Sequence, residues 1–186
     1  MTLRRATAAD LSSARAVVLA ERLNPLGLDA SRSLAAADAR TGAWLGGGQL
    51  SPLRRAPWQQ QRQQQPGRPL QQPGQPQSQP PAFELRSLVV SPDARGRGVG
   101  TALVRALLAE AGRADVFLTT TAGRAPFYAR AGGFEEEAAA AAWREVPPLL
   151  ALEVAVGALV AGLVARQGLV VMRRRAGEGS DGGGSD

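Results

Sequence analysis

The sequence predicts one α/β domain, and three features of the chain support that fold class. Segments with strand-forming and helix-forming patterns follow one another along the chain. A glycine-rich turn near the middle joins a strand to a helix. Setting aside two non-globular stretches, 54–81 and 173–186, leaves roughly 140 residues, enough for one domain that spans 2–172.

The N-terminal residues predict a strand followed by a helix. Residues 2–7 suit a short strand, and Asp10 is expected to cap a helix whose apolar residues keep helical spacing. Pro25 disfavours continuation of that helix beyond Asn24. The Arg- and Ala-rich composition also suits a transit peptide, but the acidic Asp10 and Glu21 argue against one, and no cleavable signal peptide is evident.

The next segment reads as a β-hairpin interrupted by an insert. Residues 33–53 predict two strands with a turn at 39–42, and the three glycines 46–48 predict a bulge or a close backbone approach. From residue 54 the composition changes, and residues 59–79 hold eleven Gln interrupted by four Pro. Such a stretch cannot bury enough apolar surface to offset its ordering entropy, so 54–81 is expected to be a disordered insert.

The second half of the chain continues with strand and helix patterns. Gly132-Gly133 is a typical helix-ending signal, and the tail from Arg173 is expected to be disordered. The expected elements are a strand at 83–90, a helix at 101–111, a strand at 116–121, a helix at 125–130 and a last strand at 169–172.

Residues 149–164 are apolar on all sides apart from Glu153 and two glycines. Their length falls short of the roughly 17 to 25 residues that span a bilayer, and a carboxylate there would cost about 2.5 to 3.5 kcal/mol. A buried helix crossing the sheet is the favoured interpretation, and a membrane segment is the alternative.

The composition excludes several kinds of chemistry. Without Cys or His there is no disulfide, thiol nucleophile, Ser-His-Asp triad or His/Cys zinc site, and no metal site is expected. All 22 basic residues are Arg, which excludes a lysine-dependent phosphate loop and a Schiff base. Any catalysis must therefore use Tyr, Asp, Glu, Arg or backbone amides.

The net charge of +6 does not indicate a nucleic-acid partner. Much of the excess falls in the insert and in the cluster at 173–175, and only 4% of the residues are aromatic. No aromatic residues are interleaved with basic ones as a stacking surface would need, so we expect no nucleic acid and no membrane partner.

Arg95-Gly-Arg-Gly-Val-Gly100 follows a strand and opens a helix. Glycines at a helix entry let backbone amides converge on an anion, and the helix dipole favours negative charge there. This turn predicts a phosphate site. Its spacing differs from the G-x-G-x-x-G of dinucleotide folds, which disfavours NAD, and a purely structural glycine-rich turn is the alternative.

Two ordered motifs resemble the GNAT N-acetyltransferase superfamily. Leu88 to Leu103 is similar to its acetyl-CoA motif, and Ala125-Pro-Phe-Tyr128 followed by Gly133-Phe134 is similar to its tyrosine-containing helix. Asn24-Pro25-Leu26, Gly48-Gln49-Leu50 and the strand at 169–172 look most like plant- and alga-type members that acetylate protein amines. The resemblance implies a mixed, mainly antiparallel sheet flanked by helices and splayed where acetyl-CoA enters.

The resemblance also implies roles for individual residues. Arg95 through Thr101 would hold the CoA pyrophosphate, residues 88–90 would pair with the pantetheine arm, and Arg124, where the family usually has alanine, would contact a CoA phosphate. The implied cofactor-binding residues are Leu88, Val89, Val90, Arg95, Gly96, Arg97, Gly98, Val99, Gly100, Thr101 and Arg124.

Tyr128 and Glu84 are the candidate catalytic residues. Tyr128 would protonate the departing thiolate, and its alternative is a packed aromatic. Glu84 resembles the general base of histone-acetylating members. Strand alternation places Glu84 on one face with Arg86 and Leu88, so it is alternatively a surface carboxylate paired with Arg86.

The sequence as a whole predicts an acetyl-CoA-dependent N-acetyltransferase that acts on a primary amine. The acceptor is expected to be a protein N-terminal α-amine or a lysine, with a small-molecule amine second. A CoA-binding or scaffolding module without turnover is the alternative of another class. The expected compartment is the cytoplasm or nucleus, with a plastid as the alternative.

Overall fold

The computed structural model describes residues 1–21, 27–53, 82–137, 168–175 and 177. The expected insert at 54–81, the segment at 149–164 and most of the tail lie outside the described residues. The elements in chain order are β1 (Thr2–Arg5), α1 (Ala8–Ala20), β2 (Ser33–Ala37), β3 (Trp44–Pro52), β4 (Ala82–Val90), α3 (Val99–Ala111), β5 (Asp115–Thr121), α4 (Ala125–Gly132), β6 (Glu135–Glu136) and β7 (Leu169–Arg174), with short 3-10 turns at Ala30–Arg32, Pro92–Ala94 and Ala122–Arg124.

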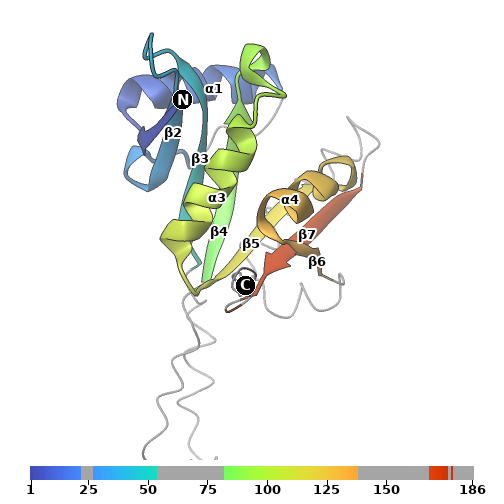
Figure 1. Cartoon of the computed structure of the whole chain (residues 1–186). Coiled ribbons are helices and arrows are strands. Elements are labelled where there is room, and N and C mark those ends of the chain that lie inside the picture. The colour runs from blue at the N-terminus through green and yellow to red at the C-terminus, as the bar shows by residue number, and fades with distance from the viewer. Residues whose placement is uncertain (22–26, 54–81, 138–167, 176, 178–186) are drawn as a thin grey trace, which may run out of the picture.

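The strands of the described residues form one seven-stranded mixed sheet in the order β1-β2-β3-β4-β5-β7-β6. Every neighbouring pair is antiparallel except β4 and β5, which run parallel. These two strands pair only over Ala82–Glu84 and Asp115–Phe117, and beyond that point they diverge. Figure 1 shows the two halves of the sheet separating from this junction in a V. The expected mixed, mainly antiparallel α/β fold is confirmed.

Helices cover both faces of the sheet. Helices α3 and α4 pack on one face, where Leu103, Leu107, Leu118 and Phe134 are almost fully buried. Helix α1 packs on the other face through Ala14 and Val18, which contact Val89 of β4. The apolar spacing of α3 therefore buries its stripe against β3 and β4, as the sequence predicts.

A β-bulge lies where β3 and β4 pair. The register shifts between Gly47 and Gln49, and Ser87 of β4 has a φ of 53°. A Cβ at Gly46 would lie 2.8 Å from the Val89 carbonyl oxygen, and one at Gly48 would lie 2.9 Å from a Leu107 methyl carbon. Both expectations for this glycine run, a bulge and a close approach, are confirmed.

The bulge changes which side chains of β4 share a face of the sheet, so the predicted arrangement is corrected. Glu84 and Arg86 pair with Ser51 and Gln49, whereas the Leu88 side chain contacts the α3 face of the sheet near Gly48. Simple alternation predicts Leu88 on the same face as Glu84 and Arg86. That prediction is wrong, because the extra residue at the bulge moves the side chains that follow it to the opposite face. Glu84 and the cleft-lining Leu88 thus lie on opposite faces.

The N-cap of α1 also differs from the residue that the sequence predicts. Thr7, not Asp10, is the N-cap, and Asp10 is the third helical residue of a capping box in which each side chain binds the other's backbone amide. Asp10 additionally accepts two hydrogen bonds from Arg4 of β1, at 2.5 and 3.0 Å. The carboxylate therefore joins the first strand to the first helix.

Replacing Asp10 by Asn is expected to lower the free energy of unfolding at pH 7 by about 2 kcal/mol. Burial alone would raise the Asp10 pKa, but hydrogen bonds from Arg4 and Thr7 outweigh it and lower the pKa from 3.8 to about 2. Because the folded-state pKa is depressed, the stabilisation is complete above about pH 4 to 5 and disappears as the pH falls towards 2.

Urea unfolding between pH 2 and pH 7 measures this contribution. The difference between wild type and Asp10→Asn should shrink to near zero at the acid end. Asp93→Asn, at an exposed carboxylate, is the control and should show little change at any pH. A pH-independent difference for Asp10→Asn would assign the loss to packing instead of charge.

The last strand is longer than expected. Strand β7 extends to Arg174, so the prediction that the disordered tail begins at Arg173 is wrong by two residues. Arg173 pairs with Asp115 at 2.6 Å and its guanidinium lies 5.1 Å from the centre of the Phe117 ring, which holds the extension against β5. Strand β6 is short and was not predicted from the sequence. Among the described helices, none has the length and apolarity to cross a membrane.

Candidate functional site

A cleft of about 480 Å³ lies beside the edge of β4, on the α3 and α4 side of the sheet. It runs from the glycine-rich turn to Tyr128. Its lining contains the predicted residues Leu88, Val89, Val90, Arg95, Gly96, Gly98, Val99, Gly100, Thr101, Arg124 and Tyr128, together with Glu21, Ala94 and Phe127. Of the predicted residues, Arg97 and Glu84 do not line it.

The glycine-rich turn has the backbone conformation that its sequence requires. Gly96 and Gly98 have φ values of 72° and 77°, in the left-handed region that side chains other than glycine rarely adopt. Gly98 is the N-cap of α3, so the first amides of that helix point out of its N-terminus at the cleft. A helix N-terminus behind a glycine turn is a favourable position for a phosphate.

Gly100 is needed for packing and not for its backbone angle. A Cβ at this position would lie 3.2 Å from the ring of Phe127, so the glycine lets α3 and α4 approach each other closely. This approach brings the start of α3 next to the helix that carries Tyr128.

The edge of β4 forms one wall of the cleft. Leu88 to Val90 line it, and the pairing of β4 with β5 stops at Glu84. The other edge of β4 pairs with β3 as far as Val90. Residues 88–90 therefore present one main-chain edge to the cleft, where an extended ligand with amide groups can add as a further strand would.

Tyr128 is packed in the cleft wall with 9% of its surface exposed. Its ring makes edge contacts with Phe127 and Phe134, at centroid distances of 5.0 and 6.2 Å. Burial raises the pKa of the hydroxyl above 10, and the nearby Arg124 guanidinium and a hydrogen bond with Thr120 lower it in part. The hydroxyl is therefore protonated at neutral pH and can act as a proton donor. Thr120, which hydrogen-bonds to it, has a role that sequence reasoning missed.

Glu84 lies on the opposite face of the sheet. It is 8% exposed, its carboxylate lies 3.5 Å from the Arg86 guanidinium, and it pairs with Phe117 at the last position where β4 and β5 are joined. Glu84 and Tyr128 thus flank the point of divergence from opposite sides. The structure brings Glu84 and Arg86 together, as one of the two sequence interpretations expects.

A buried glutamine organises the same face. Gln49 is 2% exposed, its side-chain oxygen accepts from the Asp29 amide, and its side-chain nitrogen donates to the Gly27 carbonyl and to Ser51. Gln49 pairs with Arg86 across the strands, and Ser51 pairs with Glu84. These contacts hold residues 27–29 beside the Glu84 face, a role for which the sequence carried no signal.

Glu21 is a further residue whose role sequence reasoning missed. It caps the C-terminus of α1, and its carboxylate pairs with Arg95 and, at 3.2 Å, with Arg124. Its partners lie 74 and 103 residues away in the sequence, so no local pattern pointed to this contact.

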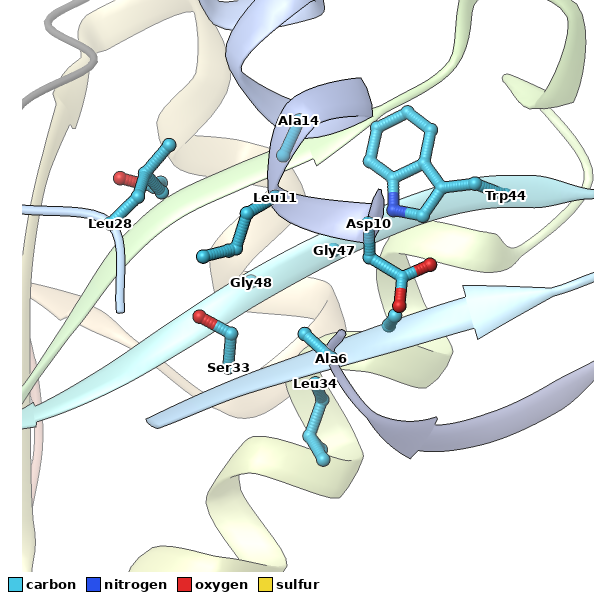
Figure 2. Close-up of a pocket in the computed structure, with 12 residues that line it drawn as sticks. Ala6, Asp10, Leu11, Ala14, Leu28, Ser33, Leu34, Trp44, Gly47 and Gly48 are labelled. Atoms are coloured by element: carbon cyan, nitrogen blue, oxygen red, sulfur yellow. The ribbon is translucent and has the colours of Figure 1, made fainter. Parts of the chain in front are cut away.

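A second cavity, of about 10 Å³, lies between α1 and strands β2 and β3. Figure 2 shows Leu11 and Ala14 of α1 facing Trp44 and the glycines of β3 around it. It has room for no more than about one water molecule, so it is a packing gap and not a substrate site. Within the described part of the chain, no group of acidic residues could hold a metal ion.

Comparison with known proteins agrees with the geometry of the cleft. A family model described as an acetyltransferase (GNAT) domain matches residues 68–136, which contain β4, the glycine-rich turn, α3, β5 and α4. None of the curated proteins matches the chain.

Several solved structures share the fold. Rv2747 from Mycobacterium tuberculosis, in complex with CoA, has a TM-score of 0.58 at 20% identity over 93% of this chain and 98% of that one. N-acetylglutamate synthase from Neisseria gonorrhoeae, complexed with coenzyme A and N-acetyl-glutamate, gives 0.60 at 15% identity over 94% of this chain and 35% of that one. Ribosomal-protein-alanine N-acetyltransferase from Brucella melitensis gives 0.53 at 19% identity over 94% and 99%.

The match of the family model covers the elements that line the cleft apart from the end of α1, and the matches to two of these structures cover 93% and 94% of this chain. Residues 68–136 are therefore similar to a GNAT acetyltransferase domain, and together with the shared fold this similarity supports an acyltransferase whose co-substrate is acetyl-CoA.

Proposed function

We propose that this protein transfers the acetyl group of acetyl-CoA to the primary amine of a protein, either an N-terminal α-amine or a lysine. The observation that carries the proposal is a cleft that joins a glycine-rich turn at a helix N-terminus, an edge of β4 without a strand partner among the described residues, and a buried tyrosine hydroxyl. The sequence resemblance to plant- and alga-type members that acetylate protein amines supports a protein acceptor.

The cleft suits acetyl-CoA in charge, shape and polarity. The amides of the turn and the guanidinium groups of Arg95 and Arg124 suit the phosphates. The edge of β4 at residues 88–90 suits the two amides of the pantetheine arm. The reactive end of the arm would then lie toward Tyr128, at the other end of the lining from the turn.

The chemistry follows from which face each group occupies. Glu84, beside the junction of β4 and β5, would accept the proton of the attacking ammonium. The neutral nitrogen forms a bond with the thioester carbonyl carbon, the carbon–sulfur bond breaks, and the sulfur leaves with the bonding electrons. Tyr128, from the cleft side, would give its proton to that sulfur.

The transfer from Tyr128 to sulfur runs uphill in pKa, because a phenol is a weaker acid than a thiol and burial increases the difference. Arg124 and Thr120 reduce that cost because both favour the tyrosinate that forms. The nitrogen of the acylated adduct then gives its second proton to the tyrosinate, which restores the Tyr128 hydroxyl, so the products are a neutral amide, a free thiol and a protonated Glu84 that releases its proton to water.

A small-molecule amine is the second candidate acceptor. The fold similarity to a synthase of N-acetylglutamate, whose acceptor is an amino acid, favours it. The similarity to a ribosomal-protein-alanine N-acetyltransferase favours a protein α-amine. The two similarities point to different acceptors, so the acceptor must be identified directly.

Mass spectrometry of a mixed peptide library incubated with the protein and acetyl-CoA tests the proposal. The library carries free α-amines on some peptides and internal lysines on others, and free amino acids are added as a separate arm. We expect peptide acetylation, and the share on α-amines and on lysines identifies the acceptor class.

The Tyr128→Phe variant is the control for this experiment. Acetylation that persists unchanged in the variant would show that the Tyr128 hydroxyl is not the proton donor, and a reaction without the protein measures chemical transfer. Modification of amino acids alone would replace the protein acceptor by a small molecule. Binding of acetyl-CoA without any acetylation would make the domain a CoA-binding module.

A further inference from the structure

Glu21 joins three elements at the mouth of the cleft. It lies at the end of α1, Arg95 lies in the glycine-rich turn before α3, and Arg124 lies just before α4. One carboxylate oxygen of Glu21 pairs with Arg95, and the other lies 3.2 Å from Arg124. All three residues line the cleft.

The three side chains differ in how freely they contact water. The Glu21 side chain is 20% exposed, whereas those of Arg95 and Arg124 are 51% and 57% exposed. The carboxylate is therefore the inner, more enclosed member, and the two guanidinium groups close over it. Each guanidinium is positioned by the same acid, although the two arginines come from opposite sides of the V.

A phosphate and a carboxylate compete for the same kind of donor. Both are anions that accept charge-assisted hydrogen bonds from guanidinium groups, and a phosphate carries more charge and more acceptor oxygens. Glu21 reduces the charge of this corner from +2 to +1. An incoming phosphate is also repelled by the carboxylate unless the carboxylate moves away.

We propose that Glu21 is a specificity-determining residue of the donor site, whose carboxylate is exchanged for a phosphate group of the acyl donor between Arg95 and Arg124. This inference rests on the proposed acetyl-CoA-dependent function. In the absence of donor the carboxylate occupies both arginines and offsets one of their two charges, so that weakly bound anions gain little from them. A donor that also binds the turn and the β4 edge supplies the free energy that displaces it.

The exchange predicts a gain in affinity when Glu21 loses its charge. Glu21→Gln keeps the size and one acceptor oxygen but removes the negative charge that repels the phosphate. We expect the Kd of acetyl-CoA, measured by titration calorimetry, to fall by about 5- to 10-fold at low salt, and the gain to shrink at high salt because the arginines are half exposed. Rim charges of this kind typically alter association and salt dependence.

Two comparisons restrict the effect to the phosphate groups. S-acetylpantetheine carries the thioester and both amides but no phosphate, so kcat/KM with this donor should be the same for wild type and Glu21→Gln. The control variant is Glu110→Gln, because Glu110 pairs with Arg5 at 3.0 Å at the far end of α3 and does not line the cleft. It should leave the Kd of acetyl-CoA unchanged, and melting curves verify that both variants fold.

The outcomes separate this inference from the proposed function. A lower Kd in Glu21→Gln, confined to the phosphate-bearing donor, supports the exchange. A higher Kd would show that Glu21 instead orders the arginines for binding, and an unchanged Kd would show that it does not compete with the phosphate. An equal effect on S-acetylpantetheine would show a general disturbance of the cleft. Each of these results overturns the inference while acetyl-CoA still binds. Absence of acetyl-CoA binding to the wild type would overturn the proposed function, and this inference with it.

Discussion

Replacing Tyr128 by Phe is expected to lower kcat by about 10²- to 10⁴-fold, the usual loss when a positioned proton donor is removed, and to leave the Kd of acetyl-CoA nearly unchanged. The ring is 9% exposed and packs on Phe127 and Phe134, and Phe preserves both contacts. The variant removes only the hydroxyl oxygen and its hydrogen bond with Thr120. Without that proton the sulfur must leave as a bare thiolate inside the cleft.

Single-turnover rates and calorimetry measure the two quantities separately. The matched control is Phe134→Leu, which disturbs the packing of the Tyr128 ring but keeps its hydroxyl. It should lower the melting temperature and leave most of kcat intact. A Tyr128→Phe enzyme with wild-type kcat would assign the tyrosine to packing, which is the alternative that the sequence left open.

The pH dependence gives an independent check on Tyr128. Its hydroxyl is protonated below its pKa, and burial places that pKa above 10. The rate of the wild-type enzyme should therefore rise with pH as the acceptor amine loses its proton, and it should show no alkaline decline until the pH exceeds about 10. A decline near pH 8 to 9 would identify a different proton donor.

The glycine-rich turn was predictable because its conformation depends on a few adjacent residues. Positive φ at Gly96 and Gly98 and the start of α3 follow from the local sequence, and so does the end of α4 at Gly133, where φ is 67°. The strands on either side were predicted to within about two residues for the same reason. The cleft lining could then be read from these elements once the family pattern gave them an order.

Contacts between distant segments were not predictable in this way. The facing of β4 depends on a bulge at Ser87, and one extra residue there moves Leu88 to the other face from Glu84. Strand propensity carries no signal for such a bulge on β4, although the glycines of β3 indicated one on the partner strand. The bridging role of Glu21 depends on how α1, the turn and α4 meet in space.

The capping of α1 shows how a correct element can carry a wrong residue assignment. Asp10 is a favourable N-cap type, but so is Thr7, and the two lie three residues apart as a capping box requires. The sequence alone satisfies either assignment. The choice is made by Arg4, which binds the Asp10 carboxylate from β1 and fixes it one turn into the helix.

The role of Glu84 should be visible as a difference between two acceptor classes. From their ordinary pKa values, deprotonation at pH 7 costs about 4.6 kcal/mol for a lysine and only about 1 kcal/mol for an α-amine. A base at the junction of β4 and β5 therefore contributes far more to the acetylation of lysine. Glu84→Gln should lower kcat/KM by about 10²- to 10³-fold for a lysine acceptor and by about 10-fold or less for an α-amine.

Two peptides of the same sequence make this comparison, one with a free α-amine and no lysine, the other blocked at its N-terminus and carrying one lysine. The loss for lysine should diminish between pH 7 and pH 9, because more of the amine is neutral before it binds. Arg86→Gln is the matched control: it breaks the 3.5 Å ion pair but leaves the carboxylate in place. If both variants lose similar stability and neither discriminates between the peptides, Glu84 is a structural partner of Arg86, and the amine must reach the cleft already neutral.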